Sequence, residues 1–383
     1  MTKYTDFINY HLSMLMDNVR TDAYRQALSR VVKPGDVVVD VGCGSGILSF
    51  LARRAGAKHV YAIESEDVIE IAKLVAAQNG MQDKVTFFKD VSLHVELPEK
   101  VDVIVTETMG TFGFEEGILG SLADARDRFL KPGGRLIPHS LDLFLVPVEM
   151  PQFYQHVVDF WVTGCHGLDF SPVRSLTVNN FHPLKLHEGT FLSQPTRVDH
   201  IVFADTKKTE IDTELSVYAQ RKGKLHGLAG WFNAELMPGL SISNGPNDKA
   251  SHWGLAFFPI DKPVPVDRGN RIAAKVQSTG NGEYWNWRVE VNGQKFEHSS
   301  RRGSLQSAAA PPALPTDLAP ALSRRGEIER FVLSQFDGQK RIGDLVNELL
   351  QQFPAEVTSK EQAATIVSEA VRRFTNSMPG KAD

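Results

Sequence analysis

Between residues 35 and 150, short runs of β-branched residues alternate with stretches of helical character. The runs Val37–Val41, Val60–Ile63 and Val101–Val105 are almost free of polar residues. Such runs are typical of strands that are buried on both faces of a parallel sheet. A helix-compatible stretch, Val68 to Gln78, lies between the second and third runs. This alternation predicts βαβ units and an open α/β sheet.

The sequence pattern changes after Pro138. Residues 139–298 carry short alternating runs and frequent turn residues. From Trp285 to Val291 every second residue is apolar, so one face of that strand is apolar. These features predict an antiparallel second domain, either a β-barrel or a β-sandwich. Residues 151–195 interrupt it with aromatic and helical character.

Two further segments follow the second domain. Residues 299–325 are rich in proline, alanine and serine without an apolar period, which predicts a flexible linker. Residues 326–383 are predicted to form a small helical domain. Apolar residues fall at helical spacing there, from Ile342 to Phe353 and from Val367 to Phe374.

Composition excludes several classes of protein. The chain has 383 residues, 42% hydrophobic and 23% charged, as in soluble proteins of two or three domains. No run has the length of a membrane-spanning helix, and residues 1–6 lack the apolar segment of a signal peptide. The net charge of −4 gives no general attraction to nucleic acid. Cys43 and Cys165 cannot build a disulfide framework or a cysteine zinc site. We therefore expect a reduced, cytoplasmic protein without metal, membrane or direct nucleic-acid contacts.

A glycine-rich turn follows the first predicted strand. The segment Asp40-Val41-Gly42-Cys43-Gly44-Ser45-Gly46 joins that strand to a predicted helix, and its glycines let the backbone approach a ligand closely. Glu64 ends the next strand, where a carboxylate can accept both hydroxyls of a ribose. These features predict nucleotide binding. The alternatives are a tight turn beside a surface glutamate, and a dinucleotide oxidoreductase, against which the G-x-G-x-G spacing argues mildly.

Two glutamates form a second candidate site. Glu107 closes the strand Val101–Val105, at the edge where α/β sheets bind ligands. The loop Met109–Phe114 contains two glycines and can return Glu116 to the same pocket. Two carboxylates held together raise each other's pKa, and a guanidinium resolves this because it offers paired donors to each. The alternative is that Glu116 caps the helix that begins just after it.

Four motifs, in the same order, resemble the protein arginine methyltransferase family. The segment His11–Thr21 resembles its N-terminal helical motif, and Asp40–Leu48 resembles its S-adenosylmethionine loop. The segment Thr106–Glu116 resembles its double-glutamate loop, with the same nine-residue spacing, and Ser251–Trp253 resembles its Thr-His-Trp loop. The resemblance covers about residues 1–298. It implies an N-terminal helix and a Rossmann-like S-adenosylmethionine-binding α/β domain over residues 1–138, followed by a β-barrel substrate domain over residues 139–298.

At the matching positions the resemblance implies a role for each site residue. Glu107 and Glu116 would clamp the substrate guanidinium. His252 would lie beside them, although a lone histidine there is more typical of a structural residue. Glu64 would hold the ribose hydroxyls, and Arg20 would pair with the methionyl carboxylate. The other cofactor-binding residues that the resemblance implies are His11, Met14, Asp40, Gly42, Gly44, Gly46 and Ser92.

The sequence departs from the family pattern in three places. The paired tyrosines before the covering helix have no clear equivalents, although Tyr4, Phe7 and Tyr10 lie near. The acid that meets adenine falls near Ser92, where no carboxylate stands. Ile118 replaces a methionine that many members carry. The last departure leaves open whether the product is monomethyl, asymmetric dimethyl or symmetric dimethyl arginine.

Residues 151–195 resemble the family's dimerisation arm, and Gly167–Ser171 fits its middle. This implies a head-to-tail homodimer, in which the arm pairs with the sheet domain of a second subunit. The alternative is a local helical excursion that packs on its own barrel.

The C-terminal unit lies outside that family. Phe331–Gly338 followed by Ile342–Phe353 resembles the small winged-helix peptide chaperone of pyrroloquinoline quinone biosynthesis. The resemblance implies a module that binds leader peptides through a strand edge. The alternative is a helical domain that aids assembly.

The predicted function is S-adenosylmethionine-dependent N-methylation of an arginine guanidino group in a protein or peptide. One alternative is methylation of free arginine or another small guanidine. A second, from another class, is a catalytically inactive dimeric scaffold. Intact Glu107, Glu116, Arg20 and Gly44 argue against the scaffold.

Overall fold

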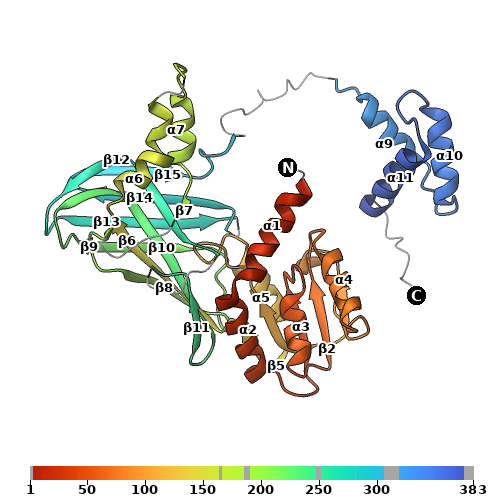
Figure 1. Cartoon of the computed structure of the whole chain (residues 1–383), viewed down its shortest axis with the longest axis horizontal. Helices are drawn as coiled ribbons and strands as arrows, with labels where there is room; N and C mark the ends of the chain where they lie inside the picture. Colours follow the sequence, from red (N-terminus) through yellow and green to blue (C-terminus); the bar gives the residue numbers. More distant parts are fainter. Residues whose placement is uncertain are drawn as a thin grey trace. The chain divides into compact units, whose positions relative to one another are not determined.

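The computed structural model describes residues 3–163, 166–184, 190–246, 252–280, 282–305 and 319–374. Cys165, Ser251 and residues 306–318 of the predicted linker lie outside this part. The chain divides into two compact units, Met1–Ala310 and Pro311–Asp383, which Figure 1 colours along the sequence.

A five-stranded parallel sheet with the order β3-β2-β1-β4-β5 opens the larger unit. Its strands β1, β2 and β4 are buried almost throughout, as their continuous apolar runs predict. The bounds are α1 Lys3–Met16, α2 Asn18–Val31, β1 Val37–Val41, α3 Ile47–Arg54, β2 His59–Ile63, α4 Ile69–Gln78, β3 Val85–Phe88, η1 Ser92–His94, β4 Val101–Thr106, α5 Ile118–Phe129 and β5 Leu130–Ile137. The predicted α/β domain is confirmed.

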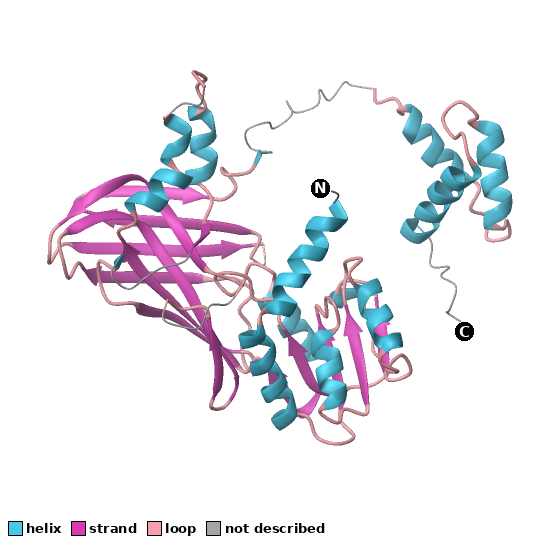
Figure 2. Ribbon diagram, viewed as in Figure 1, coloured by secondary structure: helices cyan, strands magenta, loops and turns pink. Residues whose placement is uncertain are grey.

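The strand order reverses at β1, and this places the site. The chain runs from β1 outward to β3 and returns to β4 on the other side of β1. Because such crossovers are right-handed, α3 and α4 cover one face of the sheet and α5 the other, and Figure 2 shows helices in front of and behind it. Val41 and Thr106 are register partners at the carboxyl ends of β1 and β4. The glycine turn and Glu107 therefore leave the sheet side by side, where such folds bind ligands.

The second domain consists of two antiparallel sheets around a shared core. One has the order β7-β12-β10-β6-β8 with β11 paired to β10, and the other the order β15-β14-β13-β9. The ring of Phe258 lies against those of Trp285 and Trp287 in that core. The bounds are β6 Ser140–Val148, β7 His182–Leu184, β8 Thr196–Val202, β9 Asp212–Tyr218, β10 Gly223–Met237, β11 Leu240–Ser243, β12 Leu255–Val266, β13 Arg271–Thr279, β14 Tyr284–Val291 and β15 Gln294–Ser299. The predicted antiparallel domain is confirmed.

The helical excursion lies between β6 and β7 and projects beyond the sheets in Figure 1. It comprises α6 Pro151–Val157, η2 Asp159–Val162 and α7 Ser171–Val178. Tyr154 anchors its base, because the buried phenol contacts the carbonyl oxygens of Ile260 and Asp261 at 2.8 Å each. Phe160 and Leu168 remain 46% and 62% exposed. The excursion thus packs on its own domain at one end and presents apolar side chains elsewhere.

The structure corrects the bounds of the predicted linker, residues 299–325. The backbone N–H of Ser300 donates to the carbonyl of Trp285 at 2.8 Å, and the side-chain amide of Asn180 donates to the carbonyl of Gly303 at 2.8 Å. Residues up to 303 therefore pack on the antiparallel domain. At the other end, the helix α9 begins at Arg324, because the side chain of Ser323 caps its first turn.

The smaller unit contains the helices α9 Arg324–Ser334, α10 Ile342–Gln352 and α11 Lys360–Phe374 around an apolar core of their own. Helices are confirmed here. Residues 319–374 contain no strand, so the strand edge that the peptide-chaperone resemblance implies is not in this described range. The winged-helix assignment therefore stays a prediction. Within the described ranges of the whole chain, no helix is long and apolar enough to cross a membrane.

Candidate active site

A cavity of about 550 Å³ lies at the carboxyl ends of β1, β2 and β4. Most of the residues predicted from the sequence line it: His11, Met14, Arg20, Gly42, Gly44, Glu64, Ser92, Glu107 and Glu116. Asp40, Gly46 and His252 are outside this lining. In the described ranges, no three His, Cys, Asp or Glu side chains are placed to share a metal ion.

The turn after β1 presents bare backbone to the cavity. Gly42, Gly44 and Gly46 all have positive φ, at 72°, 53° and 85°, which side chains disfavour. A Cβ on Gly42 would lie 2.6 Å from Cγ2 of Thr108, and one on Gly46 would lie 2.7 Å from the ring of Phe50. A Cβ on Gly44 would meet only the ring of His11, at 3.6 Å. Gly46 therefore serves the packing of the turn, while Gly42 and Gly44 border the cavity.

Asp40 supports this turn from inside the domain. Its fully buried carboxylate accepts a hydrogen bond from the hydroxyl of Ser49 on α3 at 2.6 Å. Burial raises the pKa of Asp40 to about 7. The structure thus shows Asp40 tying the strand to the helix, and its predicted contact with the cofactor stays a prediction.

Glu64 is fixed at the end of β2 by two backbone groups. Its carboxylate accepts hydrogen bonds from the N–H groups of Gly44 and Glu66, each at 2.9 Å. The carboxylate therefore borders both the glycine turn and the cavity, as a ribose-binding acid requires. Asp90 also lines the cavity, near Ser92, and sequence reasoning missed it. The sequence could have indicated it, because Asp90 lies two residues after Phe88, the last residue of β3, and ligands bind at the carboxyl ends of such strands.

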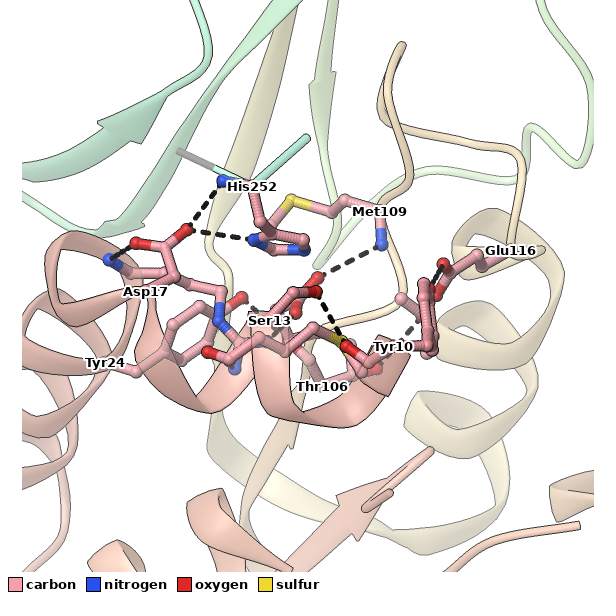
Figure 3. Close-up of polar contacts among 12 residues, drawn as sticks. Tyr10, Ser13, Asp17, Tyr24, Thr106, Met109, Glu116 and His252 are labelled. Carbon is pink, nitrogen blue, oxygen red and sulfur yellow. Dashed lines mark hydrogen bonds and ion pairs between the residues drawn. The ribbon is translucent and has the colours of Figure 1, made fainter. Parts of the chain in front are cut away.

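Glu107 and Glu116 face this one cavity. Glu107 follows the last residue of β4, and the glycine-containing loop returns Glu116 to the same space. Burial, followed by the charge of Glu107, raises the pKa of Glu116. The hydroxyl of Tyr10 donates to Oε1 of Glu116 at 3.0 Å, as Figure 3 shows. These contacts favour the guanidinium clamp over the helix cap.

A guanidinium of the chain itself already contacts one of these carboxylates. Arg20 forms an ion pair with Glu107, and both side chains are only 6% exposed. The pair gives the buried Glu107 carboxylate a cationic partner, as a buried charge requires. The predicted contact of Arg20 with the methionyl carboxylate is not tested by this geometry.

His252 is held by Asp17, which sequence reasoning missed. The carboxylate of Asp17 caps α2 by accepting the N–H of Arg20 at 3.0 Å, and it contacts Nδ1 of His252 at 2.9 Å (Figure 3). Burial alone would raise the pKa of Asp17, but the hydrogen bonds from His252 and Arg20 outweigh it and hold the pKa at about 2. An ionised Asp17 fixes Nδ1 as the donor and leaves Nε2 as the proton acceptor. The available signal was an acidic N-cap three residues before Arg20.

This fold and cavity define a class, the S-adenosylmethionine-dependent methyltransferases with an α/β sheet, here followed by an antiparallel domain. Residues 21–139 match the family model of the ribosomal protein L11 methyltransferase, and residues 139–290 match that of the arginine methyltransferase oligomerization subdomain. Neither match extends into the smaller unit.

Comparison with individual relatives identifies the family within this class of methyltransferases. The chain is 38% identical to a probable protein arginine N-methyltransferase 6 of Arabidopsis thaliana, over 76% of this chain and 79% of that protein. It is 33% identical to protein arginine N-methyltransferase 6 of Xenopus laevis, over 71% and 84%. The chain therefore belongs to the protein arginine N-methyltransferase family, which confirms the resemblance of the four motifs.

Solved structures share the fold. The Trypanosoma brucei PRMT1 enzyme–prozyme heterotetrameric complex with AdoHcy matches with a TM-score of 0.68 at 24% identity, over 76% of this chain and 97% of that chain. Arabidopsis thaliana protein arginine methyltransferase 10 matches with a TM-score of 0.65 at 24% identity, over 77% and 99%.

The family cofactor, S-adenosylmethionine, fits the cavity. The bare turn at Gly42 and Gly44 leaves space that a side chain would fill, and Glu64 supplies a fixed acceptor pair for ribose hydroxyls. Arg20 lines the cavity but is paired with Glu107 in this structure, so its contact with the methionyl carboxylate stays a prediction. Glu107 and Glu116 border the same cavity, so the methyl donor, S-adenosylmethionine, and the methyl acceptor, a guanidinium, can meet there.

Proposed function

We propose that this chain transfers a methyl group from S-adenosylmethionine to a guanidino nitrogen of arginine in a protein or peptide. The observation that carries the proposal is the placement of Glu107 and Glu116 in one cavity with the glycine turn. The sulfonium of the bound cofactor supplies an already activated methyl group. Glu107 and Glu116 hold the guanidinium, draw its positive charge toward the nitrogens they contact, and orient the remaining nitrogen. Orientation of this kind contributes about 7–11 kcal/mol to lowering a barrier.

The methylated guanidinium must lose a proton, and His252 is the acceptor we propose. Its Nδ1 is engaged by Asp17, so Nε2 carries the lone pair. The ionised Asp17 also stabilises the imidazolium once the proton has arrived. Glu107 or Glu116 is the alternative acceptor.

The substrate class is tested by turnover. Labelled S-adenosylmethionine is incubated with free arginine, with arginine-containing peptides and with a cell extract. Methylation of peptides or proteins supports the proposal, whereas methylation of free arginine alone favours the small-guanidine alternative. Binding of the cofactor without turnover on any guanidine would favour the scaffold. Mass spectrometry of the product decides between the monomethyl and dimethyl forms. The sequence leaves this choice open, because Ile118, which is buried, replaces a methionine that many family members carry.

The assembly we propose is a homodimer built by residues 151–195. The second domain matches an oligomerization subdomain, and the excursion presents Phe160 and Leu168 to solvent. Exposed apolar side chains of this kind mark interaction surfaces. Leu74 on α4 is also exposed and offers an apolar surface on the sheet domain.

Two further expectations belong to this proposal. A cytoplasmic location rests on the scarcity of cysteine, and cell fractionation tests it. Absence of direct nucleic-acid binding rests on the net charge of −4, and a filter-binding assay with RNA and DNA tests it.

A further inference from the structure

One buried side chain joins three segments of the larger unit next to the active site. Asn244 directly follows β11 and is only 4% exposed. Its side-chain amide donates to the carbonyl oxygen of Thr111 at 2.7 Å and to that of Gly254 at 2.5 Å. Its Oδ1 accepts the backbone N–H of Phe232, on β10, at 2.9 Å. Because two partners are acceptors and the third is a donor, only one orientation of the amide satisfies all three.

The first of these segments is the loop that joins the two glutamates of the guanidinium clamp, and Thr111 lies within it. The loop is braced from inside, because the carboxylate of Glu115 accepts the backbone N–H groups of Phe112 at 2.6 Å and of Phe114 at 3.0 Å. Glu116 is the residue that follows this brace. A displacement of the backbone at Thr111 therefore reaches the carboxylate that holds the guanidinium.

The second segment carries His252, two residues before Gly254. Between them, the ring of Trp253 packs edge to face on the ring of Phe232, with centroids 5.1 Å apart and an interplanar angle of 78°. Asn244 accepts the backbone N–H of the same Phe232, so the asparagine and the tryptophan hold one point of β10. Asp17 fixes the ring of His252, whereas these contacts fix its backbone.

We propose that Asn244 is a positioning residue that holds the clamp glutamates and His252 at a fixed separation. Proton transfer from the methylated guanidinium to His252 requires both within hydrogen-bond reach of the same group. Asn244 lies outside the lining of the cavity, so it acts through the carbonyl groups of Thr111 and Gly254. This inference rests on the proposed function, and none of the four sequence motifs contains Asn244.

The test removes the two donors of Asn244 in two ways. Asn244→Asp keeps the shape of the side chain but sets an oxygen against two carbonyl oxygens, so both contacts are lost. Asn244→Ala removes the same donors without burying a charge, which keeps the test usable if the first variant does not fold. Asn180→Asp and Asn180→Ala are the matched controls. The side-chain amide of Asn180 also donates to two carbonyl oxygens, that of Leu176 on α7 at 3.1 Å and that of Gly303 after β15 at 2.8 Å.

Hydrogen–deuterium exchange with mass spectrometry follows the two segments without turnover. In both Asn244 variants we expect the amides of residues 107–117 and of residues 252–260 to exchange about 10-fold faster than in the wild type, because buried hydrogen bonds that hold both segments are lost. The Asn180 variants should keep wild-type exchange in these two segments. A residue that serves only general stability would not select them.

Kinetics on a synthetic peptide with one arginine between glycines give the second measurement. We expect kcat/KM to fall on the order of 100-fold in both Asn244 variants, as a misplacement of about 1 Å can cause, while affinity for S-adenosylhomocysteine is kept. His252→Ala should then lower kcat by a smaller factor in the Asn244→Ala background than in the wild type, because His252 is already displaced there.

Three results would overturn the proposal in a folded Asn244 variant: wild-type exchange in either segment, wild-type kcat/KM, or equal effects of His252→Ala in the two backgrounds. A wild type that methylates no arginine peptide would contradict the proposed function instead. The exchange measurement would then still decide whether Asn244 joins the two segments, since it needs no substrate.

Discussion

Glu107 and Glu116 share one buried space, and such a pair is stable as two carboxylates only beside a cation. Glu107→Gln and Glu116→Gln keep the shape of each side chain but weaken its hold on a guanidinium. We expect kcat/KM to fall on the order of 100–1,000-fold for each variant while cofactor affinity is kept. Kinetics with labelled S-adenosylmethionine and calorimetry measure the two quantities. If both variants methylate normally, the guanidinium clamp is wrong and Glu116 serves as a helix cap.

Asp17 acts on the reaction through His252. In Asp17→Asn the amide can also donate to Nδ1, so the imidazole loses its fixed tautomer. We expect kcat to fall on the order of 100-fold, with KM for the peptide nearly unchanged. Steady-state kinetics at several pH values measure this split. If kcat falls equally in His252→Ala and in the double variant that combines Asp17→Asn with His252→Ala, both residues serve one step.

Gly44 gives a third prediction at the scale of residues. Gly44→Val places a branched side chain at φ 53° beside the cofactor space, so we expect binding of S-adenosylmethionine to be lost. Gly80→Val is the control, because Gly80 has a similar φ of 64° but no atom within 4 Å of an added Cβ. Calorimetry on both folded variants measures the difference. Wild-type affinity in Gly44→Val would remove this glycine from the cofactor site.

At the scale of elements, the helical excursion α6–η2–α7 joins the antiparallel domain at one end and exposes apolar residues elsewhere. A deletion of residues 151–195 is a poor test of the arm, because it would also remove β7, the partner of β12. Point substitutions avoid this loss. We predict that Phe160→Glu with Leu168→Glu yields a folded monomer with little activity, because two charges then face an apolar partner surface. Light scattering at micromolar concentration measures the mass. Tyr218→Glu, another exposed position, should leave the assembly unchanged.

A wild type that is already monomeric in the same measurement would contradict the arm assignment. The excursion would then be a local feature of its own domain.

At the scale of the whole molecule, the smaller unit has its own core and lies beyond both matched family models. We predict that a chain ending at residue 305 still dimerises and binds S-adenosylmethionine but methylates its native substrate with a higher KM. A tethered binding unit raises the effective concentration of its ligand to roughly millimolar over a short linker, so its loss acts on KM and spares kcat. A generic arginine peptide is the control and should be unaffected. Loss of cofactor binding on truncation would make the unit structural, and unchanged native-substrate kinetics would exclude substrate recognition.

The sequence by itself determined the α/β sheet, the glycine turn and the glutamate pair. These features are local, because β-branched runs specify buried parallel strands and glycine is the residue that tolerates positive φ. Glu64 and Glu107 follow from the same logic, since the carboxyl ends of parallel strands meet at one edge. The bounds of the linker were less well determined, because the packing of residues 300–303 depends on distant groups such as Asn180.

Only the tertiary structure decided the contacts that complete the site. Asp17 and His252 are 235 residues apart, and Tyr10 and Glu116 are 106 apart. Neither pair follows from local propensity, because each depends on where α1 and α2 pack against the rest of the larger unit. Asp40 belongs to the same motif as the glycine turn, and only the fold shows that its carboxylate is buried against Ser49, while its predicted contact with the cofactor stays a prediction. A motif fixes which groups reach the end of a strand, whereas packing between distant segments decides which of them face the same space.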